Sequence, residues 1–150
     1  MTLSDAYLGT GLFYFISNNQ LISLDVSDIT TLSNMLCFDN QLTTLDVSGC
    51  TALTDLWCND NQLTSLNITG CSAFDVLACS SNQLTSLDVS GCTVLSNLNC
   101  GYNRLISLNV SGCTALAILS CDENQLTSLD VSGCTALGTL YFQYNNVSSI

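Results

Sequence analysis

Apolar residues recur along this chain in one short phrase, Leu-x-x-Leu-x-apolar, which occurs twice in every block of 21 residues. In one block these positions are Leu53, Leu56 and Cys58, followed by Leu63, Leu66 and Ile68. Each phrase ends in an alternation of apolar and polar residues, which is typical of a short strand, whereas an amphipathic helix needs apolar residues at i, i+3, i+4 and i+7. The pattern predicts a strand at about residues 55–58 and a second extended segment at about residues 66–68.

The blocks keep a fixed length, because one asparagine returns every 21 residues without insertion. These residues are Asn19, Asn40, Asn61, Asn82, Asn103, Asn124 and Asn145. Such a period is typical of a solenoid, in which each repeat buries its apolar side against its neighbours. We expect a single solenoid over residues 1–150. It would comprise a degenerate N-terminal coil or cap in 1–18, six repeats in 19–144 and a truncated last coil in 145–150.

Asparagine and cysteine residues also recur once or twice in each repeat and are expected to face inward. The asparagine amides are expected to point inward and bond backbone groups, since buried backbone groups need partners. The ten cysteines form two rows with the same period, namely Cys37, Cys58, Cys79, Cys100 and Cys121, and Cys50, Cys71, Cys92, Cys113 and Cys134. They occupy apolar positions, where a free thiol packs as a small hydrophobe. We therefore expect reduced, buried thiols and a reducing or anaerobic environment.

The phrase Leu53-x-x-Leu56-x-Cys58-x-x-Asn61-x-Leu63 resembles the signature of the leucine-rich-repeat family. The resemblance covers about residues 11–150 and recurs six times. It implies a right-handed stack of coils with a parallel sheet, and the extended segment at 66–68 in place of the family's usual helix implies little or no helix and low curvature. The sequence of the repeats is similar to that of short leucine-rich repeats in bacterial surface and secreted proteins. The resemblance therefore implies an extracellular or cell-surface location, and a cytoplasmic location is the alternative.

Sequence variation between repeats is concentrated at the outward positions of the first strand. These positions are Asn34, Leu36 and Phe38; Asp55, Trp57 and Asn59; Val76, Ala78 and Ser80; Asn97, Asn99 and Gly101; Ile118, Ser120 and Asp122; Thr139, Tyr141 and Gln143. By resemblance, this face recognises a protein or glycan. We predict binding residues at Leu36, Phe38, Asp55, Trp57, Asn59 and Val76. Phe13 and Phe15 either extend the apolar patch in the same phase or belong to an N-terminal cap. The competing explanation for the variable outward positions is sequence drift at exposed sites.

Charge narrows the range of partners. The chain carries one Lys or Arg against twelve Asp or Glu, a net charge of -11, which favours basic or polar partners and disfavours nucleic acid and anionic membranes. No apolar run approaches the ~18 residues of a membrane-spanning helix, so we expect no membrane insertion. The sequence has no His, no Cys-x-x-Cys and no phosphate-binding loop, so we predict a non-catalytic protein without metal or cofactor.

Four alternative functions remain. The outward row Asp25, Asp46, Asn67, Asp88, Asn109 and Asp130 suggests a calcium ladder, although two of its six members are Asn. The flanking Ser and Thr rows suggest ice binding, for which they are a poor match. A polysaccharide lyase would use Arg104 as base, with Asp122 and Glu123 holding a metal. The fourth alternative is structural: a spacer or self-assembling unit that stacks end to end, because no polar cap is evident at the C-terminal end.

Overall fold

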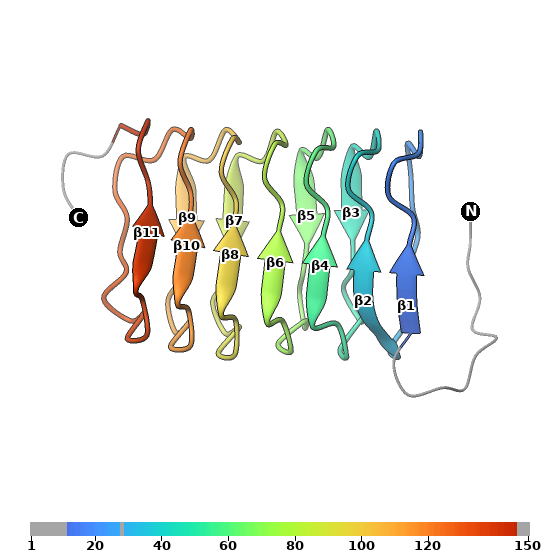
Figure 1. Ribbon diagram of the computed structural model, residues 1–150, viewed down its shortest axis with the longest axis horizontal. Helices are drawn as coiled ribbons and strands as arrows, with labels where there is room; N and C mark the ends of the chain where they lie inside the picture. The colour runs from blue at the N-terminus through green and yellow to red at the C-terminus, as the bar shows by residue number, and fades with distance from the viewer. Residues whose placement is uncertain (1–11, 28, 147–150) are drawn as a thin grey trace.

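The computed structural model describes residues 12–27 and 29–146. The predictions for residues 1–11 and 147–150, which concern the first part of the N-terminal coil or cap and the end of the last coil, lie outside these ranges. Within them the chain forms a stack of similar coils whose strands stand side by side in a nearly straight row (Figure 1). The low curvature expected from the extended second segment is therefore seen.

One face of the stack is a seven-stranded parallel sheet, which we call the front sheet. In spatial order its strands are β1 (Leu12–Phe15), β2 (Leu32–Leu36), β4 (Asp55–Trp57), β6 (Val76–Ala78), β8 (Asn97–Asn99), β10 (Ile118–Ser120) and β11 (Thr139–Tyr141). From β2 onward each residue pairs with the residue 21 positions later, as Asp55 does with Val76. The predicted strand at 55–58 is confirmed and ends one residue early. Only β1 departs from this register, by one irregularity between Leu12 and Phe13.

The second extended segment forms three-residue strands on the other side of the stack. These are β3 (Thr44–Asp46), β5 (Ser65–Asn67), β7 (Ser86–Asp88) and β9 (Ser107–Asn109). They pair only as β3 with β5 and β7 with β9. Among residues 12–27 and 29–146 no segment is helical, as the pattern predicted, and so none offers a helix long and apolar enough to cross a membrane.

The interrupted pairing follows the order of Asp and Asn in the outward row. Asn67 Nδ2 donates to the Asp46 carboxylate at 3.1 Å, between the paired strands β3 and β5. A bond from Asn109 likewise contributes to the lowered pKa of Asp88, after the larger effects of the Ser90 side-chain and backbone bonds. The strands are therefore paired where Asp is followed by Asn in the next coil, and they are unpaired at the step from Asn67 to Asp88.

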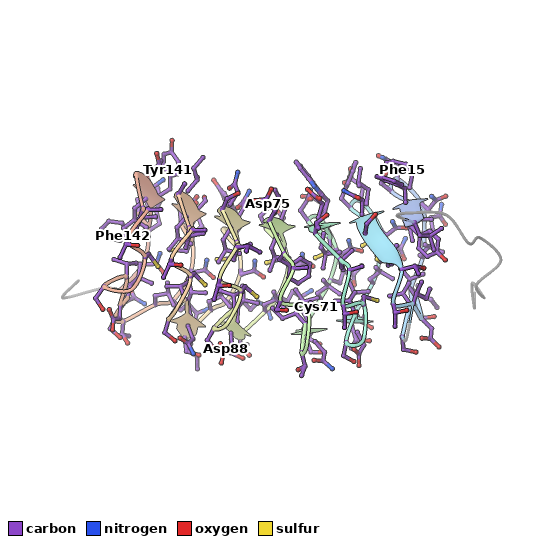
Figure 2. The ribbon with its side chains drawn as sticks, turned by 90° about the horizontal axis from the view of Figure 1, so that it is seen from below. Phe15, Cys71, Asp75, Asp88, Tyr141 and Phe142 are labelled. Atoms are coloured by element: carbon purple, nitrogen blue, oxygen red, sulfur yellow. The ribbon has the colours of Figure 1, made fainter. Side chains whose placement is uncertain are left out.

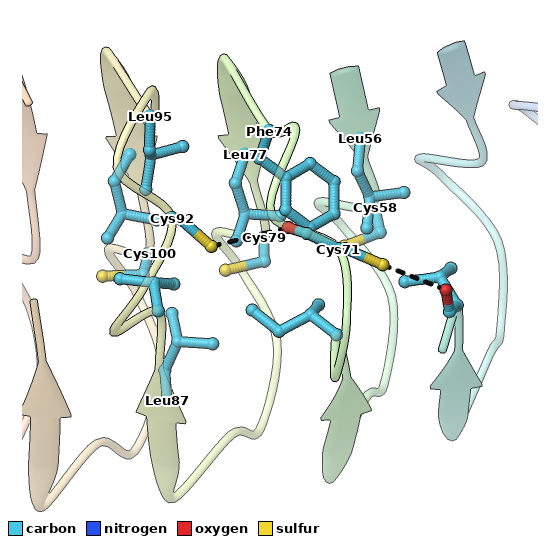
Figure 3. Packing of buried hydrophobic residues seen from close by; sticks show 14 of the residues in the cluster. Leu56, Cys58, Cys71, Phe74, Leu77, Cys79, Leu87, Cys92, Leu95 and Cys100 are labelled. Atoms are coloured by element: carbon cyan, nitrogen blue, oxygen red, sulfur yellow. Dashed lines mark hydrogen bonds between the residues drawn. The ribbon is translucent and has the colours of Figure 1, made fainter. Parts of the chain in front are cut away.

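The core is a narrow column of leucine, valine and cysteine side chains, with Phe74 as its largest fully buried member (Figure 3). All ten cysteines are buried thiols that form no disulfide bond, as predicted. The Cys71 thiol donates to Val47 O of the preceding coil at 3.1 Å. Burial raises the pKa of Cys79 to about 12 and that of Cys58 well above its usual range. These thiols are therefore protonated side chains of the core.

The asparagine row lies inside the turns, as predicted. Asn82 Oδ1 accepts from the N–H of Leu63 at 2.9 Å, and its Nδ2 donates to the carbonyls of Cys58, Cys79 and Ser80 at 3.0, 3.1 and 3.1 Å. Equivalent bonds recur in neighbouring coils, for example at Asn103. Each asparagine thus ties its own coil to the coil before it, which explains why the repeat tolerates no change of length.

Positive φ angles occur in two rows. Gly49, Gly70, Gly91 and Gly112 have φ between 79° and 87°, a conformation that glycine adopts without strain. The second row contains no glycine. Its members are Asn18, Asp39, Asp60, Ser81, Tyr102, Glu123 and Tyr144, with φ of 52–58°. These residues directly precede the asparagine row and form an exposed ridge, which we call the rim, beyond the carboxyl ends of the front strands.

Candidate functional site

The outward side chains of the front sheet lie in straight rows across the coils. The register places Phe15, Leu36, Trp57, Ala78, Asn99, Ser120 and Tyr141 in one central row. A second row contains Phe13, Asn34, Asp55, Val76, Asn97, Ile118 and Thr139. Because adjacent parallel strands are about 4.8 Å apart, residues that are far apart in sequence form a continuous surface.

The structure brings the six predicted binding residues together at the N-terminal half of this face. Leu36, Asp55, Trp57 and Val76 lie on β2, β4 and β6. Phe38 and Asn59 follow β2 and β4. Trp57 is the most exposed of the six, with 43% of its surface accessible. The ring therefore projects from the sheet, as its position between two inward residues predicted.

Two features of the predicted surface need correction. Leu36 and Phe38 are half-buried, because neighbouring rows are close enough for large side chains to cover one another. Ala78 was also predicted to point outward but is buried, because its methyl group is small and the larger side chains around it cover it. The exposed apolar surface is therefore more discontinuous than a simple alternation of inward and outward residues suggests.

Phe13 and Phe15 continue the patch toward the N-terminal end. Both are exposed, and their rings stack with centroids 6.3 Å apart. Phe15 pairs with Leu36, so it lies in the same row as Trp57. The two phenylalanines belong to β1 and thus extend the front sheet itself.

Polar groups beside Trp57 are held in place by local hydrogen bonds. The Asp55 carboxylate accepts from Asn34 Nδ2 at 2.8 Å and from Thr54 Oγ1 at 2.7 Å. Asn59 Nδ2 donates to Asp60 at 2.6 Å, while its Oδ1 is buried without a hydrogen-bond partner. The aromatic ring is thus flanked by fixed carboxylates, an arrangement suited to polar or basic ligands.

The three residues named for a lyase lie in two neighbouring coils. Arg104 is exposed in the turn after Asn103, and the Asp122 carboxylate accepts from Ser120 Oγ at 2.7 Å. In the part of the chain that the structure describes, no group of three or more His, Cys, Asp or Glu side chains is arranged to hold a metal ion. A hollow of about 380 Å³ lies on the opposite side of the stack, between Ile68 and Asp88, where pairing of the short strands is interrupted.

Sequence reasoning missed the exposed aromatic residues of the rim. Tyr102 and Tyr144 project from rim positions that Asn or Asp occupies in the first coils. An aromatic residue where other repeats carry a small polar turn residue was the signal that could have revealed them.

Comparison with solved structures supports the architecture. The functional domain of InlJ from Listeria monocytogenes, which includes a cysteine ladder, is 26% identical over 91% of this chain and 44% of its own, with a TM-score of 0.57. The leucine-rich-repeat protein LIC12759 of Leptospira interrogans is 20% identical over 90% of this chain and 38% of its own, with a TM-score of 0.80. YopM from Yersinia enterocolitica is 25% identical over 85% of this chain and 27% of its own, with a TM-score of 0.75.

This chain spans less than half the length of each of those structures. No protein-family model matches the sequence, and no curated protein does. The parallel front sheet, the buried cysteine and asparagine ladders and the repeat length are features of the same architecture. This chain therefore has the leucine-rich-repeat fold, and it resembles bacterial leucine-rich-repeat proteins built from repeats of about 21 residues.

Proposed function

We propose that the chain is a non-catalytic recognition module that binds a protein, or alternatively a glycan, on the front sheet around Trp57. The observation that carries the proposal is the contrast between the two kinds of position in each repeat. Inward positions repeat the same leucine, cysteine and asparagine in coil after coil, whereas the outward positions of the front sheet differ in every coil. Folding constrains the first set, and a surface shaped for one ligand explains the second.

The chemistry of this surface indicates the partner's character. Trp57, Phe13 and Phe15 are exposed aromatic side chains, and aromatic residues are enriched among those that dominate binding energy. Asp55 and Asp60 flank Trp57, and the whole chain has a net charge of -11. A partner with an apolar centre and a basic or polar edge matches this arrangement by charge complementarity.

The likeness to bacterial leucine-rich-repeat proteins extends the proposal to location. By analogy, the chain acts at the cell surface or outside the cell, as a module of a bacterial surface protein. Its buried thiols fit a reducing or anaerobic setting, because free thiols are uncommon in oxidising compartments.

Array capture tests the proposal. The purified chain is applied to protein and glycan arrays beside a variant in which Leu36, Trp57 and Val76 are all replaced by serine. We expect the wild-type chain to retain a small set of ligands that the variant does not retain. Equal retention by both proteins would place recognition elsewhere, and no retention by either would favour a structural role.

A structural role is the second candidate, and the edges of the front sheet favour it. Within the described residues, β1 and β11 each have a neighbouring strand on one side only. Unpaired strand edges template association with further strands. Light scattering over a range of concentrations separates the two functions, since end-to-end stacking makes the mean mass rise with concentration and a monomeric recognition module keeps it constant.

A further inference from the structure

The C-terminal end of the rim carries side chains that the fold does not require. Tyr102 and Tyr144 have φ of 54° and 58° and are 60% and 74% exposed. The left-handed conformation suits Asn and Asp, which occupy the rim at Asn18 and Asp39, and it is unfavourable for a bulky residue. Rings so exposed contribute little to the core. Their presence is explained by contact with something outside the chain.

The two tyrosines flank an acidic residue of the same ridge. Tyr102, Glu123 and Tyr144 occupy equivalent positions in three successive coils, and Glu123 is exposed. Backbone bonds from Tyr102 N to Asp122 O at 2.9 Å and from Glu123 N to Gln143 O at 3.0 Å fix this order. With a coil spacing of about 4.8 Å, the backbones of the two tyrosines are roughly 10 Å apart, with the carboxylate of Glu123 between them.

A second carboxylate is fixed beside Tyr102. Ser120 Oγ donates to Asp122 Oδ1 at 2.7 Å. A Cβ atom added to Gly101 would lie 2.8 Å from the same oxygen, so Asp122 can occupy this position only because residue 101 is glycine. The carboxylate is thus held over the preceding coil, close to the backbone of Tyr102. Tyr141, 48% exposed on β11, pairs with Ser120. It lies at the end of the stack opposite Phe15 (Figure 2).

We propose that this C-terminal rim patch, made of Tyr102, Asp122, Glu123, Tyr141 and Tyr144, binds the lysine or arginine side chains of an extended basic peptide segment. A cation within about 6 Å of an aromatic ring is attracted by the face of the ring, and Arg and Lys also pair with carboxylates. A cationic side chain above Glu123 meets a carboxylate with a tyrosine on either side. The chain has a net charge of -11, and its single basic residue, Arg104, is exposed two residues after Tyr102.

The patch is separate from the surface around Trp57. Tyr102, the nearest member of the patch, follows β8, which is two strand steps or about 10 Å from β4, and Tyr144 follows β11, four steps or about 19 Å away. The two surfaces share no residue, so each can be removed by substitutions that leave the side chains of the other in place.

The test measures binding of fluorescein-labelled hexa-arginine to the full chain by fluorescence anisotropy at moderate salt. Three variants are compared with the wild type: Tyr102→Asn with Tyr144→Asn, Glu123→Gln, and Asp39→Asn. Asparagine suits the left-handed conformation, so the double variant retains the fold. Asp39→Asn is the matched control, because it removes the same charge from the same ridge at the N-terminal end.

We expect the double tyrosine variant to bind about tenfold more weakly and Glu123→Gln to bind severalfold more weakly, with Asp39→Asn close to the wild type. Equal weakening by Glu123→Gln and Asp39→Asn would mean diffuse attraction to an acidic surface and would overturn the proposal. Undiminished binding by the double tyrosine variant, or no binding by the wild type, would overturn it as well. Trp57→Ser leaves hexa-arginine binding unchanged if the two surfaces are distinct.

Discussion

Replacement of Asn82 by alanine tests the inward asparagine row at the centre of the stack. In the folded chain its side chain accepts one hydrogen bond, from Leu63 N–H, and donates to three carbonyls. The substitution leaves the fully buried Leu63 N–H without its acceptor. A buried donor left unpaired costs about 1–3 kcal/mol.

The three carbonyl groups that lose the Asn82 donor cost less free energy, because each still accepts a hydrogen bond from another donor. Cys58 O still accepts from Asn61 Nδ2 at 3.2 Å, and Cys79 O still accepts from Asn103 Nδ2 at 3.0 Å. Ser80 O retains the bond from Asp60 N at 3.1 Å. One orphaned donor and three weakened acceptors together predict a loss of about 3 kcal/mol in the free energy of unfolding.

Urea denaturation followed by circular dichroism measures this loss, and hydrogen exchange at the Leu63 amide locates it. Asn99→Ala is the matched control, since Asn99 is exposed on β8 and accepts only one long bond, from Gly101 N at 3.3 Å. We expect this control to lose less than about 1 kcal/mol. Equal losses for the two variants would refute the assigned phase, because a slip of one residue exchanges the inside of a strand for the outside.

Three further predictions concern the thiols and the turns. A thiol reagent applied without reductant should label few cysteines in buffer and ten per chain in denaturant; a count near zero in denaturant would mean disulfides. Burial raises the thiol pKa, to about 12 at Cys37 and Cys79, so the thiols of the unfolded chain ionise first. The stability that the thiols contribute should therefore be constant below about pH 8.5 and fall as the pH rises toward 12. Unchanged urea midpoints between pH 8 and 10.5 would contradict the thiol burial. Gly91→Ala should destabilise by about 1 kcal/mol more than Gly133→Ala, because Gly91 has φ of 87° and Gly133 lies outside the left-handed region; equal urea midpoints would show that φ is not the cause.

Most of the fold is predictable from the sequence because each coil repeats the same inward residues. Period-2 alternation located the strand that begins at Asp55, and the fixed spacing of the asparagines set the register across the sheet. Because the coils repeat, each one indicates separately which residues point inward and which point outward. The predicted and observed folds therefore agree because the buried side chains have the same environment in each coil.

The remainder depends on contacts between neighbouring coils that a single repeat does not contain. Asn67 lies between Asp46 and Asp88 in the outward row, and pairing is formed toward Asp46 and interrupted toward Asp88. Partial burial of Leu36 likewise depends on the size of the side chains in adjacent rows. The rim escaped prediction because its left-handed backbone is imposed by the turn, even at Tyr102 and Tyr144.

The central claim is that inward residues hold the fold and outward residues of the front sheet bind the partner, and Trp57→Ser tests it most directly. The measurement is the affinity for a ligand retained on the array, taken together with the melting temperature. Ile118→Ser is the control, since Ile118 lies on β10 of the same sheet with a similar exposure of 39% and belongs to neither proposed binding surface. An outward aromatic at the centre of an interface contributes about 2 kcal/mol or more, which is roughly thirtyfold in affinity. We predict this loss for Trp57→Ser, with an unchanged melting temperature and with the affinity of the control retained. Unfolding of the Trp57 variant, or binding equal to that of the wild type, would contradict the account.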